Sequence, residues 1–128
     1  MIVPSKIYTN LSVLDAARRR FRWIYREFKT VVVSISGGKD STVCFYLALE
    51  AARAEGRLPM HVMFLDQEME WQGTIDTVRE MMNHPDVKPF WLQIPFRTSN
   101  ATSTEEQWLH AWDPAKESVW MRKKEPDS

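Results

Sequence analysis

The seven residues from 36 to 42 constrain this chain more than any other segment. They read Ser-Gly-Gly-Lys-Asp-Ser-Thr, follow the apolar run 31–35 and precede a helical pattern that extends to residue 55. Two adjacent glycines permit positive φ and let the backbone approach an anion closely. A helix that starts here offers free N–H groups and the positive end of its dipole. A buried strand, a glycine turn and a helix start therefore predict a phosphate-binding site.

Polar side chains in the same segment strengthen this prediction. Lys39 contributes a positive charge, and hydroxyl donors come from Ser36, Ser41 and Thr42. The bland alternative is an ordinary Gly-Gly turn between a strand and a helix, which leaves the Lys-Asp-Ser-Thr sequence unexplained.

Two commoner glycine motifs are excluded by their spacing. A Walker loop requires a glycine at the position of Val33 and a Ser or Thr directly after the lysine, where Asp40 stands. The dinucleotide fingerprint requires Gly-x-Gly-x-x-Gly, and the four glycines at 37, 38, 56 and 73 do not provide that spacing.

Length and composition indicate one globular domain over residues 1–128, and the phosphate site predicted above makes it a nucleotide-binding domain. Apolar residues make up 44% and charged residues 27%, as in ordinary folded proteins. Seventeen basic residues balance seventeen acidic ones, so no overall charge attracts nucleic acid or a membrane surface. The single cysteine excludes an intrachain disulfide. Because no signal peptide and no membrane-spanning run is recognisable, we expect a cytoplasmic protein without membrane contact.

Apolar periodicity predicts alternating helices and strands. Helices are expected at 11–29, 41–55 and 74–83, and strands at 31–35, 60–65 and 89–94. This alternation is typical of a parallel α/β sheet. The run 31–35 is apolar on both faces, which favours a central strand covered by helices. After residue 95 we expect a polar loop at 97–103, a capping box from Ser103 to Glu106 and a short helix at 107–112.

The first predicted helix is rich in arginine, at positions 18, 19, 20, 22 and 26. A basic helix can contact nucleic acid or a membrane. The favoured alternative is a solvated face on a docked helix, whose apolar stripe consists of Leu14, Ala17, Phe21, Ile24 and Phe28. A third possibility is that one arginine helps to bind a nucleotide phosphate.

The segment 36–42 resembles the PP-loop of the ATP pyrophosphatase superfamily. After the second strand, Asp66, Trp71 and Thr74 are placed as in phosphoadenosine phosphosulfate (PAPS) reductases. The stretch 81–89 and the end of the chain are similar to a subgroup of phage and enterobacterial PAPS reductase-like proteins. The resemblance implies a Rossmann-like three-layer sandwich with a parallel sheet, of the adenine nucleotide α-hydrolase type, and a place in sulfur metabolism.

The resemblance also implies site residues. Those expected around the phosphates of ATP or PAPS are Ser36, Gly37, Gly38, Lys39, Asp40, Ser41 and Thr42. The backbone at Ile35, Leu65 and Asp66 should edge the base and ribose, because ligands lie beyond the carboxyl ends of parallel strands. Catalytic roles would fall on Lys39, Asp40 and Asp66, and Asp40 or Asp66 would contact Mg²⁺ directly or through water.

Each of these roles has a structural alternative. Asp40 can stabilise the helix start, and Asp66 can be a turn residue. Glu68 and Glu70 can belong to a solvated loop. Trp71, like the other late tryptophans, is expected to be a packing residue, with stacking on a base as its functional alternative. The three histidines, at 61, 84 and 110, have no evident catalytic partner.

The chain differs from the family pattern in two respects. PAPS reductases use a thiolate from a C-terminal cysteine, and no cysteine follows Cys44 here. The superfamily sheet has five strands in the order 3-2-1-4-5, whereas three strands are recognisable, which leaves 31–35 at an edge. Residues 97–128, a second copy, a partner subunit or the remainder of a longer protein would then cover that edge.

These residues and the resemblance are compatible with three functions. The first is an enzyme of the transferase or oxidoreductase type, which adenylates an acceptor with pyrophosphate release or takes part in sulfonucleotide reduction. The second is a non-catalytic regulator or subunit that keeps the nucleotide site. The third is a nucleic-acid-associated protein that uses the arginine-rich helix.

Overall fold

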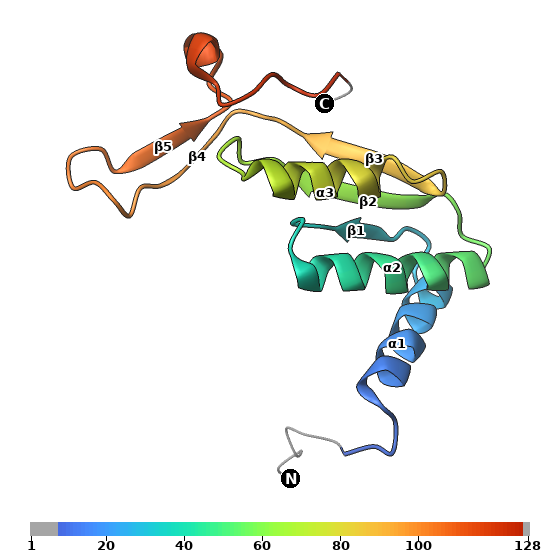
Figure 1. Ribbon diagram of the computed structural model, residues 1–128. Coiled ribbons are helices and arrows are strands. Elements are labelled where there is room, and N and C mark those ends of the chain that lie inside the picture. The colour runs from blue at the N-terminus through green and yellow to red at the C-terminus, as the bar shows by residue number, and fades with distance from the viewer. Residues whose placement is uncertain (1–7, 127–128) are drawn as a thin grey trace.

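The computed structural model describes residues 8–126 as an α/β chain (Figure 1). Its elements in order are α1 (Val13–Glu27), β1 (Val32–Ser34), α2 (Lys39–Ala54), β2 (Met60–Leu65), α3 (Gln72–Met82), β3 (Val87–Leu92), β4 (Phe96–Ser99), β5 (Trp108–Ala111) and the short 3-10 helix η1 (Pro114–Val119). The three predicted helices and three predicted strands are confirmed, with ends that shift by at most two residues.

The three predicted strands form one parallel sheet in the order β1-β2-β3. Val33 of β1 lies beside Val62 of β2, and Val62 lies beside Pro89 of β3. The Rossmann-like arrangement expected from strand and helix alternation is thereby confirmed.

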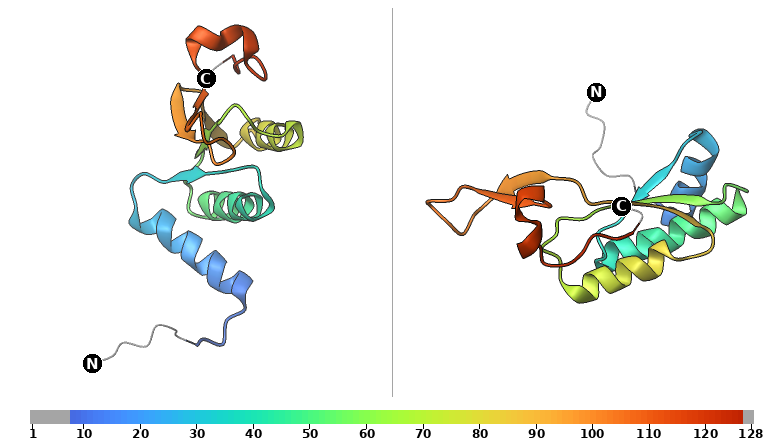
Figure 2. Two further views of the ribbon diagram at one scale, coloured as in Figure 1. Left: turned by 90° about the vertical axis from the view of Figure 1, so that its left-hand side faces the viewer. Right: turned by 90° about the horizontal axis from the view of Figure 1, so that it is seen from above.

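Helices α2 and α3 lie side by side on one face of this sheet (Figures 1 and 2). The side chains of β2 alternate: Met60, Val62 and Phe64 are buried in the core, whereas His61 and Met63 on the other face are only half-buried. Small residues on the inner side of α2, such as Ala48 and Ala52, are completely buried. The core therefore lies between the helices and one face of the sheet.

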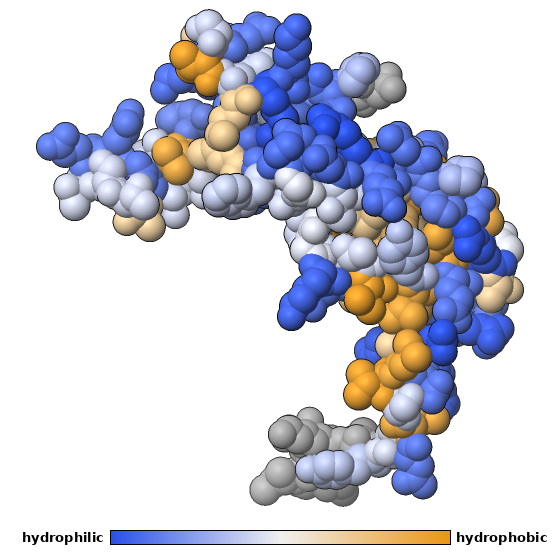
Figure 3. Space-filling view, in the orientation of Figure 1, coloured by the Kyte–Doolittle hydropathy of each residue, from blue (hydrophilic) through white to orange (hydrophobic). Residues whose placement is uncertain are grey.

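Strand β1 is an edge strand, which confirms the expectation that only the 3-2-1 half of the family sheet is present, although the apolar run alone favoured a central strand. Among residues 8–126 it pairs with β2 alone, and Val32 is 49% exposed. Val43 and Tyr46 of α2 are also exposed, as are Leu14 and Trp23 of α1. Figure 3 shows apolar surface gathered over the α1 and α2 side of the molecule. Val32 and these exposed side chains thus form a surface that none of the described segments covers, whereas Ile35 is buried in the core.

The arginines of α1 explain how this helix is attached. Arg18 pairs with Glu50 of α2, and both Arg22 and Arg26 pair with Glu55 at 2.8 Å. The Tyr25 side chain is buried in the core, and the Phe21 side chain packs against that core. The structure therefore supports the docked-helix interpretation for these three arginines. Leu14 and Phe28, expected in the apolar stripe, are exposed instead.

The shared carboxylate predicts how acid affects the docking of α1. Hydrogen bonds from Arg26 and Arg22 lower the pKa of Glu55 to about 2. Because the folded-state pKa is depressed, the stabilisation is present above the ordinary value of 4.5 and is lost as the pH falls toward 2. We expect the protection factors of the α1 amides, which correct for the intrinsic pH dependence of exchange, to fall over this range, and Glu55→Gln to lower them already at neutral pH. Equal protection factors at pH 6 and pH 3 would contradict this prediction.

The segment after β3 corrects two expectations. Residues expected as a loop form β4, and residues expected as a helix form β5, which pairs with β4 in antiparallel fashion. The hydroxyl of Ser103 accepts hydrogen bonds from the N–H groups of Glu105 and Glu106, but within a turn rather than at a helix start. Ala111 is buried while Trp108 and His110 are exposed, and this period of two fits a strand.

Candidate nucleotide site and the acidic cluster beside it

The glycine turn lies where the sequence predicts it, between the carboxyl end of β1 and the first residue of α2. Gly37 has φ +73°, and a Cβ atom there would lie 2.7 Å from Thr74 Cγ2 and 3.1 Å from the Thr74 carbonyl oxygen. Gly38 is the N-cap of α2 with φ −80°, and a Cβ atom there would make only an ordinary contact with Ser36 Oγ at 3.5 Å. Glycine is thus required at position 37, where the loop contacts the start of α3.

Hydroxyl groups of the loop form hydrogen bonds with its own backbone. Ser41 Oγ accepts a hydrogen bond from the Ser36 N–H at 3.2 Å and donates to the Gly38 carbonyl oxygen at 3.0 Å. Thr42 Oγ1 donates to the same carbonyl at 2.9 Å. These side chains fix the loop conformation, whereas the sequence pattern indicated them only as donors to a ligand.

The start of α2 offers unused hydrogen-bond donors. The first intrahelical bond runs from the Thr42 N–H to the Gly38 carbonyl, so the N–H groups of Lys39, Asp40 and Ser41 have no acceptor within residues 8–126. The side chains of Lys39 and Asp40 are exposed and form no ion pair in that part of the chain. Asp40 lies in the first turn and does not act as the N-cap. This arrangement of amides and an ammonium group suits a phosphate.

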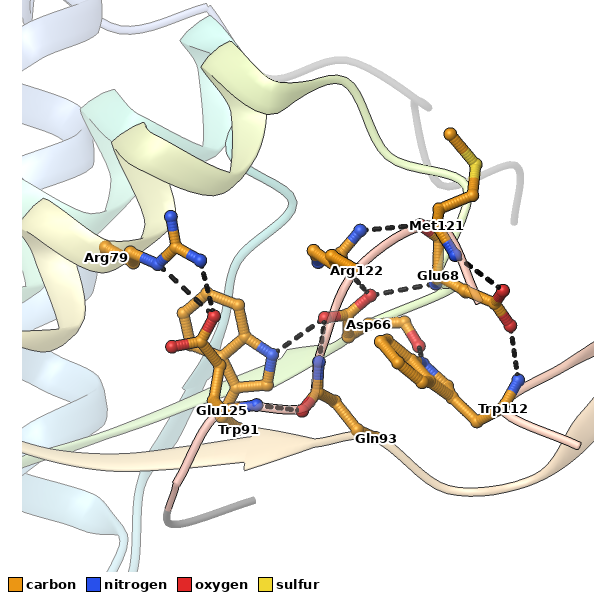
Figure 4. Close-up of polar contacts among 9 residues, drawn as sticks. All are labelled: Asp66, Glu68, Arg79, Trp91, Gln93, Trp112, Met121, Arg122 and Glu125. Atoms are coloured by element: carbon orange, nitrogen blue, oxygen red, sulfur yellow. Dashed lines mark hydrogen bonds and ion pairs between the residues drawn. The ribbon is translucent and has the colours of Figure 1, made fainter. Parts of the chain in front are cut away.

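Asp66, at the end of β2, is completely buried within a hydrogen-bond network (Figure 4). Its Oδ2 accepts from Trp91 Nε1 at 2.9 Å and from Gln93 Nε2 at 2.8 Å. Its Oδ1 accepts from the Glu68 N–H at 2.8 Å and pairs with the Arg122 guanidinium. The role of Asp66 as a catalytic residue or magnesium ligand stays a prediction, and the structure shows that four protein donors already contact its carboxylate.

Glu68 is buried too, which corrects its interpretation as part of a solvated loop. Its Oε2 accepts from the Trp112 N–H at 2.6 Å and its Oε1 from the Met121 N–H at 3.3 Å. Arg122 donates to its carbonyl oxygen at 2.5 Å. The partners come from residues 112–125, named here the tail, which the sequence pattern alone did not connect to β2.

Other predicted residues lie outside these two groups. Trp71 is 85% exposed and Cys44 is exposed, so neither serves the core. His84 lies in the turn before β3, where its Nδ1 accepts from the Asp86 N–H at 3.1 Å. In the part of the chain that the structure describes, no three His, Cys, Asp or Glu side chains are grouped as a metal site. None of the described helices is long and apolar enough to cross a membrane.

Comparison with known proteins places this geometry in a family. A profile of the phosphoadenosine phosphosulfate reductase domain matches residues 30–127. That range includes the glycine turn, the acidic cluster around Asp66 and the whole tail.

Three relatives illustrate the similarity. The uncharacterized protein YbdN of Escherichia coli K12 is 34% identical over 126 residues, which cover 96% of this chain and 30% of the relative. Sulfate adenylyltransferase subunit 2 of Mycobacterium bovis BCG is 40% identical over 75 residues, or 58% of this chain and 24% of that protein. The subunit 2 protein of Mycobacterium tuberculosis H37Rv has the same identity and coverage.

This chain thus spans less than a third of the length of these relatives. No solved structure matches it. The domain profile, which covers more than half of the sequence, and the similarity to YbdN along almost all of it agree with each other. The chain therefore belongs to the phosphoadenosine phosphosulfate reductase domain family.

Proposed function

We propose that this protein binds an adenine nucleotide, ATP or a sulfonucleotide such as PAPS, by its phosphates at residues 36–42. One observation carries the proposal: three acceptor-free N–H groups and the Lys39 side chain lie together behind the Gly37 bend. Family membership and the similarity to sulfate adenylyltransferase subunit 2 support an adenylate or sulfonucleotide as the ligand. Ile35 and Leu65, at the ends of neighbouring strands, are proposed to edge the base and ribose.

The favoured reaction is adenylyl transfer. An acceptor oxyanion attacks the α-phosphorus of ATP, a new P–O bond forms, and the bond to the β-phosphate oxygen breaks to release pyrophosphate. The α2 N–H groups and Lys39 offset the charge that develops on the leaving pyrophosphate. When bound, Mg²⁺ would neutralise further phosphate charge, and the exposed Asp40 carboxylate fits the one or two carboxylates that this ion uses beside phosphates.

A second candidate is a non-catalytic nucleotide-binding subunit located in the cytoplasm. It is favoured by the open β1 edge, which suits pairing with a partner subunit or a second copy of this chain. Two of the relatives described above are themselves named as subunits.

Replacement of Lys39 tests the nucleotide site. We expect Lys39→Ala to weaken ATP binding by about tenfold or more, since it removes a charged phosphate contact. Calorimetric titration with ATP, AMP and PAPS measures this loss, and Lys29→Ala, a lysine outside the loop, serves as the control. Pyrophosphate release from ATP with and without Mg²⁺ then separates the enzyme from the binding subunit. Absence of binding for all three nucleotides would remove both candidates.

Nucleic-acid binding through α1 receives less support from the structure. Arg18, Arg22 and Arg26 already pair with carboxylates of α2, so phosphate contacts would have to replace those ion pairs. We expect duplex DNA to bind weakly at low salt and Arg18→Ala to change that binding little. A steep decrease of affinity with salt would instead favour the nucleic-acid function.

A further inference from the structure

We propose that Asp66 and Glu68 are positioning residues that fasten the tail across the carboxyl ends of β2 and β3, where it forms one wall of the nucleotide crevice. The crevice itself rests on the function proposed above. The fastening rests only on contacts between described residues, so the two can be tested separately.

The first argument is that the Asp66 carboxylate has no acceptor capacity left. A carboxylate offers about four lone-pair positions. Four donors fill them, from the β2–α3 connection, from Trp91 and Gln93 at the end of β3, and from Arg122 of the tail. A metal ion would have to displace one of these donors and lie next to a guanidinium group. The buried carboxylate therefore serves to join three segments of the chain.

The second argument concerns backbone conformation. Within the described chain, Glu68 and Trp112 are the two non-glycine residues with positive φ, at 65° and 51°. They are bonded to each other, from the Trp112 N–H to Glu68 Oε2. Such conformations cost energy and persist where surrounding contacts impose them. The strained residues on both sides of this bond indicate that the tail is held in place by it.

The third argument is that the tail is attached at its start and again over residues 121–125 (Figure 4). At its start, Trp112 Nε1 donates to the Asp66 carbonyl oxygen at 2.8 Å. At its end, Lys124 Nζ donates to the Gln93 carbonyl at 2.8 Å, and the Glu125 N–H donates to Gln93 Oε1 at 2.6 Å. Glu125 also pairs with Arg79 of α3 at 2.7 Å. The tail is therefore held at its start and again near its end. We call this fastened tail the strap.

The place of attachment connects the strap to nucleotide binding. In parallel α/β sheets, ligands lie outside the carboxyl ends of the strands. The glycine turn follows the end of β1, and the tail covers the ends of β2 and β3 on the same side of the sheet. A nucleotide held by its phosphates at β1 therefore extends toward the tail, and a fixed tail limits the space for its base.

Amide exchange measured by mass spectrometry tests the fastening without any ligand. We expect Glu68→Gln and Asp66→Asn to accelerate exchange in residues 112–125 by about tenfold or more, the factor for one lost charge-assisted hydrogen bond. In Asp66→Asn, the side-chain amide would place an N–H group opposite groups that are themselves donors, so at least one hydrogen bond to residue 66 would be lost. Glu70→Gln, in the same connection, should leave exchange unchanged. Unaltered exchange in both test variants, with circular dichroism confirming that each is folded, would overturn the proposal.

Titration with ATP then distinguishes positioning from metal ligation. We expect Glu68→Gln, which leaves residues 36–42 and Asp66 intact, to weaken ATP binding equally with and without Mg²⁺. We expect Asp66→Asn to keep the same Mg²⁺ dependence as the unaltered protein. Loss of that dependence in Asp66→Asn, with normal exchange in the tail, would make Asp66 a metal ligand and defeat the proposal. If the unaltered protein binds no nucleotide, the proposed function fails while the exchange result still decides the fastening.

Discussion

Gly37→Val is expected to destabilise the protein by about 2–5 kcal/mol and to abolish nucleotide binding. A non-glycine residue in the left-handed region costs about 1–2 kcal/mol. The new side chain would also overlap Thr74, whose Cγ2 lies 2.7 Å from the position of a Cβ atom, and overpacking of this kind costs about 1–3 kcal/mol. Since Val78 Cγ2 lies 3.1 Å from the same position, the valine has no open direction on that side. Urea unfolding and ATP titration measure the two effects.

Gly38→Ala is the matched control for this experiment. Gly38 has φ −80°, and the nearest atom to an added Cβ is Ser36 Oγ at 3.5 Å. We expect the alanine to change the free energy of unfolding by about 1 kcal/mol or less. A Gly37→Val variant as stable as Gly38→Ala would show that the loop does not contact α3 as described.

Phe64→Ala is expected to cost about 3–5 kcal/mol, the range for truncating a fully buried aromatic residue. Phe64 lies in the middle strand of the sheet, and its ring packs edge-on against Trp91 with centroids 5.2 Å apart. Trp91 in turn holds Asp66 through its indole N–H. We therefore expect loss of overall stability together with faster amide exchange in the tail.

The neighbouring Leu65→Ala provides the contrast. Leu65 points to the other face of β2 and is 39% exposed. We expect Leu65→Ala to change the midpoint of urea unfolding much less than Phe64→Ala does. Equal losses at the two positions would contradict the assignment of one buried and one open sheet face.

Local sequence patterns predicted the features that depend on neighbouring residues, namely the turn, the helices and the strands. The glycine turn was predictable because glycine adopts positive φ readily, and Gly37 does adopt it. The parallel sheet was predictable because apolar strands alternated with helical periodicity. The position of β1 at an edge was open to two interpretations, since an apolar strand looks the same whether a described segment covers it or not.

Local sequence patterns could not predict contacts between residues that are far apart in the sequence. The side-chain partners of Asp66 and Glu68 in β3 and the tail lie 25 to 56 residues away in sequence. From the sequence alone, Asp66 was therefore interpreted as a nucleotide or magnesium contact or as a turn residue, and Glu68 as part of a solvated loop. The capping-box pattern at Ser103 failed for a related reason, because the pairing of β5 with β4 overrode a local helix signal.

The open edge of β1 has a practical consequence for work with the isolated chain. Unpaired peptide groups along an apolar strand form a template on which strands of other molecules can add. We therefore expect this chain to aggregate at high concentration. A lysine introduced at the exposed position of Val32 should improve solubility, because a charge on an edge strand opposes such addition.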